Sequence, residues 1–351
     1  MIGNQKKSII RIAVVGCGRI ADKHFEAISQ YGDKLELVAI CDNDEIALEK
    51  AKLKIKSVVL AVPDYTELLR ISDIDVIVLC TPSGIHARQT IEAAAARKHV
   101  ITEKPMATRW QDGVQMVRAC DDAGVKLFVV KQNRSNSTLQ LLKRVINEKR
   151  FGKIHMVHIN VFWTRPQDYY DQAKWRGTWE FDGGALMNQA SHYVDLLDWL
   201  VGPVDKIQAM TTTTRNIEVE DTCVLNIRWR NGALGSMSVT MLTYPQNLEG
   251  SITVLGEKGT VRIGGVAVNE IQHWQFAEPS EYDERVLTVN YKTSSIYGFG
   301  HSVYYKNVID VLNGEAAPET DGREGLKSLE IIIAAYLSAR DGKTISLPLE
   351  Y

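Results

Sequence analysis

The chain has few cysteines, no long apolar run and almost no net charge, and each of these absences excludes a class of protein. Its 351 residues carry 41 Lys and Arg against 43 Asp and Glu, which gives a formal net charge of −2. No overall positive field favours nucleic acid or an anionic membrane, so the sequence predicts neither partner. An anionic ligand must therefore be recognised by a few local basic groups.

The five cysteines lie far apart, at positions 17, 41, 80, 120 and 223, and no CxxC pair is present. An odd and scattered set argues against a disulfide framework and against a structural zinc site. His155 and His158 are three apart on a predicted strand, so they point to opposite faces, and the other histidines show no ligand spacing. No apolar stretch approaches the roughly 20 residues of a membrane-spanning helix, and Met1 to Ser8 lacks a signal-peptide cleavage site. These features predict reduced thiols, a cytoplasmic location and no bound metal.

The first part of the chain alternates short β-branched runs with longer helical stretches, the pattern of a parallel sheet covered by helices on both faces. The expected strands are 9–15, 35–41, 58–62, 76–81, 100–102 and 127–130, and the expected helices are 20–30, 85–97 and 110–123. The length of the chain suits two domains. The sequence therefore predicts an α/β domain over residues 1–131, with a doubly wound parallel sheet of the Rossmann type.

After Lys131 the pattern changes to successive strands separated by turn signals such as Asn231-Gly232. The expected strands are 154–163, 207–214, 222–229, 233–243, 251–255 and 260–263, with a helical insertion at 184–201 and a last helix at 325–340. Residues 132–351 are therefore predicted to form an α+β domain on a large, mostly antiparallel, open-faced sheet. The expected fold class of the whole chain is α/β plus α+β.

A glycine-rich turn, GCGRIA at residues 16–21, follows the first predicted strand and opens the first helix. Gly16 allows the tight turn, and Gly18 lets a pyrophosphate approach the backbone. The helix N-terminus, at Arg19 and Ile20, offers N–H groups and a positive dipole to the phosphates. The pattern predicts a dinucleotide site; the alternative is a solvated turn between a strand and a helix.

An acidic residue, Asp42, ends the second predicted strand 21 residues beyond Ala21. A carboxylate at this place accepts the two adenosine ribose hydroxyls. Residues 43–45 are Asn, Asp and Glu and supply no arginine for a 2′-phosphate. The sequence therefore predicts NAD as the cofactor and not NADP.

Small polar residues follow the strand at 76–81, where the carboxyl edge of a parallel sheet binds ligands. The residues expected near the cofactor at this edge are Thr81, Pro82, Ser83 and His86. The alternative for His86 is a surface histidine in the first turn of a helix.

The stretch Glu103-Lys104-Pro105 directly follows the strand at 100–102. A lysine at this edge points toward the nicotinamide end of the crevice, and burial beside a cofactor lowers the pKa of a lysine so that it exchanges a proton with a reacting hydroxyl. Pro105 disfavours helical geometry at Lys104, so the side chain is presented from extended backbone. The alternative is an ordinary solvent-exposed lysine.

The helical insertion at 184–201 carries the second group of candidate residues. Its apolar positions form one stripe, made of Leu186, Ala190, Tyr193, Leu197 and Leu200, and its opposite side carries Asn188, His192, Asp195 and Trp199. A histidine and an amide one turn apart converge on one small molecule, and Asp195 is placed to orient the imidazole. The alternative is an exposed polar face.

In order and spacing, the GCGRIA turn, Glu103-Lys104-Pro105, Trp175-Arg176 and Gly183-Gly184 through His192 resemble the Gfo/Idh/MocA oxidoreductases. The resemblance covers nearly the whole chain. It implies that Lys104 and His192 flank the substrate hydroxyl and act as the catalytic residues. It also implies a set of further cofactor contacts, from Glu103, Lys104, Gln132, Trp175 and Arg176.

Two positions depart from the family pattern. Many members have a third glycine where this chain has Asp182, and an aspartate where it has Asn188. Because an amide cannot act as a carboxylate base, Asn188 is expected to bind and orient the substrate.

The segment 162–181 is rich in aromatic residues and arginine, a composition that stacks rings and pairs with carboxylate or phosphate. A subunit-interface loop has the same composition. With residues 187–192, the segment resembles the subgroup that oxidises UDP-2-acetamido-2-deoxy-D-glucuronate at C3 in lipopolysaccharide O-antigen assembly. The 3-keto product of those enzymes passes to a pyridoxal-phosphate aminotransferase. The resemblance implies a UDP-linked sugar acid as substrate, Arg165 as its uronate or pyrophosphate contact, Tyr297 in the sugar pocket, and a homotetramer.

Other functions stay open from the residues alone. One is another sugar or polyol dehydrogenase, acting on inositol or glucose, and a second is an NAD-dependent glycosidase that returns the hydride internally. A third is a ligand-sensing protein without catalysis, against which the presence of Lys104 and His192 argues. The sequence also leaves open whether Lys104 or His192 is the general base, and whether NADH is recycled by 2-oxoglutarate.

Overall fold

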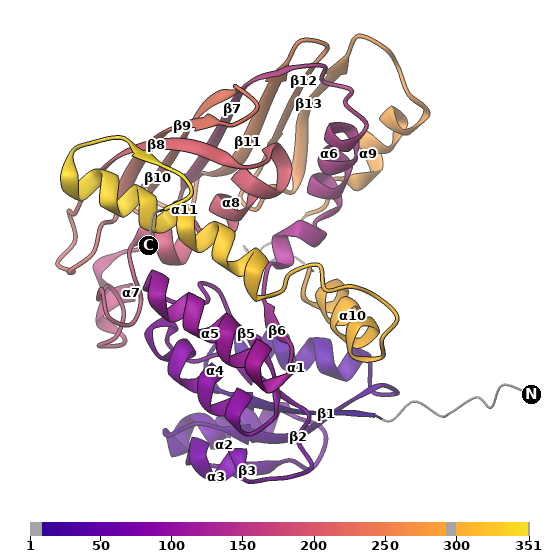
Figure 1. Ribbon diagram of the computed structural model, residues 1–351, viewed down its shortest axis with the longest axis vertical. Coiled ribbons are helices and arrows are strands. Elements are labelled where there is room, and N and C mark those ends of the chain that lie inside the picture. Colours follow the sequence, from indigo (N-terminus) through magenta and orange to yellow (C-terminus); the bar gives the residue numbers. More distant parts are fainter. Residues whose placement is uncertain (1–8, 293–299, 350–351) are drawn as a thin grey trace, which may run out of the picture. The chain divides into compact units, whose positions relative to one another are not determined.

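The computed structural model describes residues 9–292 and 300–349, and the chain folds into two compact units (Figure 1). The first consists of Met1–Val130 and His301–Leu326, and the second of Lys131–Gly300 and Lys327–Tyr351. The segment His301–Leu326 thus packs with the first unit, whereas the sequence assigns everything after 131 to the second domain. Among the described residues, no helix is both long and apolar enough to cross a membrane.

The first unit contains a six-stranded parallel sheet with strand order β3-β2-β1-β4-β5-β6. The strands are β1 (Ile10–Val15), β2 (Leu35–Cys41), β3 (Leu60–Val62), β4 (Val76–Leu79), β5 (His99–Thr102) and β6 (Leu127–Val129). The central strands are apolar and buried on both faces, as a helix-covered parallel sheet requires. This confirms the predicted doubly wound sheet.

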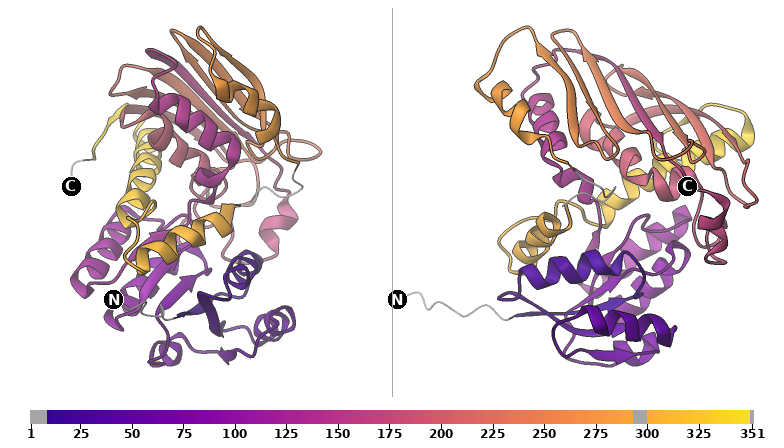
Figure 2. Two further views of the ribbon diagram at one scale, coloured as in Figure 1. Left: turned by 90° about the vertical axis from the view of Figure 1, so that its right-hand side faces the viewer. Right: turned by 180° about the vertical axis from the view of Figure 1, so that it is seen from behind.

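Helices lie on the two faces of this sheet (Figure 2). They are α1 (Ala21–Gln30), α2 (Glu45–Lys54), α3 (Tyr65–Leu69), α4 (His86–Ala95), α5 (Trp110–Ala123) and α10 (Gly300–Leu312). Helices α1 and α10 share one apolar core with alternate residues of β1 and β4, such as Phe25, Tyr305, Val14 and Val78. Helices α4 and α5 pack against each other. The sequence did not predict α10, which joins this core from far along the chain.

The second unit is built on an eight-stranded sheet with order β13-β12-β11-β7-β10-β9-β8-β14. Its strands are β7 (Ile154–Phe162), β8 (Val204–Thr212), β9 (Thr222–Trp229), β10 (Leu234–Thr240), β11 (Glu249–Gly256), β12 (Gly259–Gly264), β13 (Glu270–Phe276) and β14 (Ile345–Ser346). Within the described part of this sheet, only the pairing of β7 with β10 is parallel. The mostly antiparallel sheet was predicted; β13 was missed because this edge strand is mostly polar.

Alternate residues of β9 are buried and exposed, so one face of the sheet is covered. The covering helices include α6 (Ser137–Asn147), the inserted segment η3-α8-η4 (Ala185–Gln189, Ser191–Leu196, Leu197–Val201) and the last helix, α11 (Gly322–Asp341). The indole Nε1 of Trp229 on β9 donates to the carbonyl of Leu197 at 3.1 Å. Ser338 of α11 accepts from the backbone N–H of Ala209 on β8. The remaining short helices are η1 (Ser83–Ile85), η2 (Gln132–Ser135), α7 (Gln167–Asp171), η5 (Glu281–Arg285) and α9 (Val286–Val289).

Candidate active site

The glycine-rich turn lies where the sheet of the first unit reverses its strand order. Gly16 follows β1 and has φ +89°, and a Cβ at this position would lie 2.7 Å from the carbonyl carbon of Cys80, which follows the neighbouring strand β4. A Cβ at Gly18 would meet nothing within 4 Å. Gly16 is thus required by the close approach of two strand ends, while the backbone at Gly18 is open to an incoming group. This arrangement fits a pyrophosphate at the N-terminus of α1.

The Asp42 carboxylate is held beside this turn by two backbone groups. Its Oδ2 accepts from the Cys17 N–H at 2.7 Å, and its Oδ1 accepts from the Asp44 N–H at 2.9 Å. The side chain therefore connects the end of β2 to the glycine-rich turn. A carboxylate fixed at the end of β2 suits the ribose of NAD.

Replacement of Asp42 by alanine is expected to weaken NAD binding about ten- to hundredfold, because each lost hydrogen bond to a charged group is worth roughly 1.5–3 kcal/mol. The control is Asp44→Ala. Asp44 caps the N-terminus of α2 by accepting from Ile46 and Ala47, so its loss should lower stability but leave the dissociation constant of NAD unchanged. Titration of NAD into both variants measures the two dissociation constants. An equal rise of the dissociation constant in both would contradict the role of Asp42.

His86 is fully buried, so the surface alternative for this residue is wrong. Its Nε2 lies 2.9 Å from the carbonyl oxygen of Thr81 and its Nδ1 lies 3.1 Å from that of Pro105. Burial lowers the pKa of the imidazole, against the effect of these two hydrogen bonds. His86 thus joins the backbone after β4 to the backbone after β5. Contacts of Thr81, Pro82, Ser83 and His86 with the cofactor stay a prediction.

Glu103 directly follows β5 and turns its carboxylate into the protein, with only 5% of the residue exposed. Its Oε1 lies 3.0 Å from Nε2 of His24, and its Oε2 accepts from the Lys104 N–H at 3.1 Å. Both carboxylate oxygens are therefore engaged within the protein. Lys104 is half-buried at the same strand end, and its catalytic role stays a prediction.

In the second unit, the inserted segment Ala185–Val201 contains α8 between two π-helical turns. The predicted apolar stripe is buried throughout. The opposite side is not an exposed polar face, because His192 and Asp195 are also buried.

The N-terminus of this segment is capped by a carboxyl and a phenol that the sequence did not single out. Glu220 Oε1 accepts from the Leu186 N–H at 2.9 Å, and the Tyr336 hydroxyl accepts from the N–H groups of Gly184 and Met187. The Tyr336 hydroxyl donates to Glu220 Oε1 at 3.0 Å. The pair satisfies N–H groups that the first turn of a helix leaves without intrahelical partners.

Asp182 and Asn188, the two residues that depart from the family pattern, contact each other. The amide Nδ2 of Asn188 donates to Oδ1 of Asp182, whose Oδ2 accepts from the Gly177 N–H at 2.7 Å. This contact fixes the Asn188 amide, so that its nitrogen faces Asp182. A fixed amide suits the expected role of Asn188, which is to orient a substrate.

His192 contacts a residue that the sequence assigned to the cofactor. Nε2 of His192 lies 3.0 Å from Nε2 of Gln132 on η2. An amide nitrogen only donates, so in this contact Nε2 of His192 is the acceptor. Gln132 is thus a candidate for holding His192 in place.

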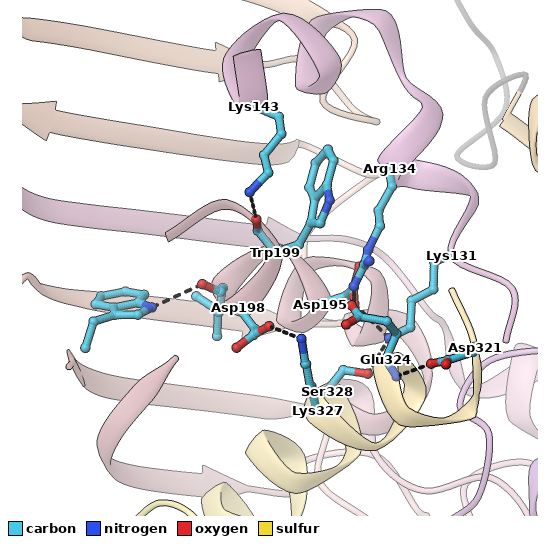
Figure 3. A network of polar contacts seen from close by, with 12 residues as sticks. Lys131, Arg134, Lys143, Asp195, Asp198, Trp199, Asp321, Glu324, Lys327 and Ser328 are labelled. Atoms are coloured by element: carbon cyan, nitrogen blue, oxygen red, sulfur yellow. Dashed lines mark hydrogen bonds and ion pairs between the residues drawn. The ribbon is translucent and has the colours of Figure 1, made fainter. Parts of the chain in front are cut away.

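Asp195 was expected to orient His192, but its carboxylate is bound by two cations (Figure 3). Lys131 Nζ lies 2.8 Å from Oδ1, and Arg134 approaches both oxygens at 2.7 Å. Burial alone would raise the pKa of Asp195, yet the two cations lower it to about 2. These ion pairs connect η2, which carries Gln132, to α8, which carries His192. Figure 3 also shows a hydrogen bond in the same region, which Lys143 donates to the carbonyl of Trp199.

Within the segment 162–181, arginine side chains stack on aromatic rings. The guanidinium carbon of Arg165 lies 5.5 Å from the Trp163 ring and 5.4 Å from the Tyr169 ring, and that of Arg176 lies 4.4 Å from Tyr169. Within the described part of the chain, both arginines donate to neutral oxygens of the backbone and of amides. Trp175 lies beside a shallow pocket lined also by Lys174, Thr178, Glu180, Phe181 and Glu218. Tyr297 lies outside the described residues.

Two family models match most of the chain. The NAD-binding Rossmann fold of an oxidoreductase family (GFO_IDH_MocA) matches residues 10–131, and the C-terminal alpha/beta domain of the same family (GFO_IDH_MocA_C) matches residues 143–347. Both agree with the two types of sheet seen in the structure.

Two solved structures are 60% identical to this chain, and both are WlbA dehydrogenases in complex with NADH and UDP-GlcNAcA. The protein from Bordetella pertussis has a TM-score of 0.95, with 98% of this chain and 99% of that chain covered. The protein from Chromobacterium violaceum has a TM-score of 0.93, with both chains covered completely. A myo-inositol 2-dehydrogenase from Thermotoga maritima is 25% identical, over 96% of this chain and 98% of its own length.

Proposed function

We propose that this chain, which belongs to the Gfo/Idh/MocA family of oxidoreductases, catalyses the NAD-dependent oxidation of UDP-2-acetamido-2-deoxy-D-glucuronate (UDP-GlcNAcA) at C3. One observation carries the proposal: the 60% identity, over nearly the whole chain, to two WlbA dehydrogenases in complex with NADH and UDP-GlcNAcA. The product is the 3-keto sugar acid. In O-antigen assembly it would pass to a pyridoxal-phosphate aminotransferase that makes a 2,3-diamino uronic acid.

The chemistry requires a proton acceptor and a fixed substrate. When bound, NAD would supply the nicotinamide ring that accepts the hydride from C3. Lys104 and His192 hydrogen-bond the reacting hydroxyl, and one of them takes its proton; a general base of this kind contributes typically about 10²–10⁴-fold. Asn188, fixed by Asp182, orients the sugar.

The substrate is an anion with a pyrophosphate and a carboxylate, whereas the chain has a net charge of −2. Recognition therefore depends on local cations. Arg165 suits this role because it donates to the neutral oxygens of Thr164 and Asn247, so its charge is not neutralised by a carboxylate at these contacts. A planar guanidinium binds carboxylate and phosphate in bidentate fashion. Arg176 and Trp175, stacked in the same segment, are proposed to lie near the cofactor.

The same proposal includes a homotetramer assembled through the open sheets and a location in the cytoplasm. The five cysteines are all free thiols in the structure, which suits a reducing compartment.

The test is to supply the purified protein with NAD and UDP-GlcNAcA and to follow NADH absorbance and the sugar product. NADH and a 3-keto sugar acid are expected. Inositol and glucose, offered in parallel, should give little NADH; efficient oxidation of either would contradict the substrate assignment. Release of a free sugar without net NADH would instead identify a glycosidase.

A further inference from the structure

A buried cluster in the first unit joins three ionisable side chains that no local sequence pattern connects. His24 on α1, Glu103 after β5 and His301 on α10 place one ligand-type atom each within 4.8 Å of the others. His24 Nε2 lies 3.0 Å from Glu103 Oε1, and His301 Nε2 lies 3.6 Å from the same oxygen. The two imidazole rings meet edge to face at 5.4 Å. All three residues are buried, with at most 5% of each exposed.

Helix α10 also holds His24 in place. Nδ1 of His24 lies 2.8 Å from the hydroxyl of Tyr305, one turn along α10 from His301. Both ring nitrogens of His24 therefore have partners within the protein. Burial lowers the pKa of His24, whereas for Glu103 the two imidazoles outweigh burial and hold the pKa well below its usual range. Glu103 is thus a buried carboxylate held ionised by α1 and α10.

The same carboxylate also reaches the neighbouring residue in the chain. While Oε1 faces the two histidines, Oε2 accepts from the backbone N–H of Lys104 at 3.1 Å. The backbone N–H of Glu103 is in turn held by the carbonyl of Leu79 on β4 at 3.0 Å. The backbone of Lys104 is therefore held by a carboxylate that His24 hydrogen-bonds and that His301 approaches to 3.6 Å.

A metal site is the competing explanation, because two imidazoles and a carboxylate are common ligands. The spacing between His24 and Glu103 is that of a hydrogen bond. Moreover, Oε2 of Glu103 is directed to the Lys104 N–H and not toward the histidines. The contacts of His24, Glu103 and the Lys104 N–H are those of a hydrogen-bond network, and His301 adds a contact of 3.6 Å, since its ring nitrogens make no hydrogen bond within the described part of the chain.

We propose that His24 and His301 are positioning residues, which act through Glu103 to hold Lys104 in its reactive place. The inference rests on the proposed role of Lys104 and deepens it. The side chains of the two histidines point at Glu103, so they influence the reaction by fixing where the lysine backbone lies. A displacement of about 1 Å at a reacting group costs roughly 10²-fold in rate.

The test compares three variants with the intact enzyme. His24→Leu removes the contact with Glu103, and His24→Gln restores a side chain that can donate to it. Phe25→Leu is the matched control, because Phe25 lies beside His24 in α1 and packs in the same core without being part of the cluster. We expect His24→Leu to lower kcat about ten- to hundredfold with little change in KM for NAD, His24→Gln to recover most of the loss, and Phe25→Leu to keep kcat even if it lowers thermal stability.

Three outcomes would overturn the inference. The first is an unchanged kcat in soluble His24→Leu, and the second is an equal loss of kcat in Phe25→Leu. The third is an equimolar transition metal in the purified enzyme that disappears in His24→Leu. If His24→Leu does not fold, His301→Leu makes the same test from α10. Failure of the proposed function is distinct, because the unaltered protein would then form no NADH from UDP-GlcNAcA.

Discussion

Lys104→Met is expected to lower kcat by about 10²–10⁴-fold while the dissociation constant of NAD stays nearly unchanged. Methionine keeps most of the length of the side chain but has no ammonium group to exchange a proton with the substrate hydroxyl. A positioned general acid or base contributes an effect of this size, and His192→Asn should cause a similar loss because it removes the imidazole from α8. The measurements are kcat at saturating UDP-GlcNAcA and a direct titration of NAD.

Lys50→Met provides the control, since Lys50 is an exposed lysine on α2 and should leave both quantities unchanged. A fall in NAD affinity as large as the fall in kcat would show that Lys104 mainly binds the cofactor. Comparison of the two catalytic variants also addresses the question that the sequence left open. The true general base should cause the larger loss of kcat, and the loss in that variant should shrink as the pH rises and the hydroxyl ionises more readily.

The features that the sequence predicted well depend on neighbours in the chain. The turn at Gly16, the carboxylate at Asp42 and the strand-end position of Lys104 each belong to a strand followed by a loop. Parallel strands bring such loops to one edge of the sheet. The mostly antiparallel sheet was predicted for the same reason, because alternation and tight turns are local signals.

The contacts that the sequence could not predict join distant segments. Asp195 was expected to orient His192, but Lys131 and Arg134, from a much earlier part of the chain, bind its carboxylate. His24 and His301 meet at Glu103 only because α10 returns to pack on α1. One signal for His24 was present: it lies on the buried face of α1 with Phe25 and Ile28, and a histidine on an apolar face needs a buried partner.

The cap formed by Glu220 and Tyr336 makes the stability of the second unit depend on pH. Burial raises the pKa of Glu220 from 4.5 to about 7, against the hydrogen bonds from Leu186 and Tyr336. Its Oε2 is buried and accepts no hydrogen bond from the described residues. The folded chain therefore keeps a proton on Glu220 over a range in which the unfolded chain has released it. The contribution of this group to stability is greatest below pH 4.5, and it falls as the pH rises toward and through 7.

Glu220→Gln should therefore be more stable than the unaltered chain at pH 8, by up to about 3 kcal/mol, and should differ little from it at pH 5. The amide resembles the protonated carboxyl at every pH, so the cost of burying a charge at the start of the inserted segment disappears. Urea unfolding of both proteins at the two pH values measures the difference. Glu284→Gln is the control, because Glu284 is an exposed glutamate of the same unit. An equal gain at pH 5 and pH 8 would mean that the pKa of Glu220 is not raised in the folded protein, and the pH dependence described for this cap would be wrong.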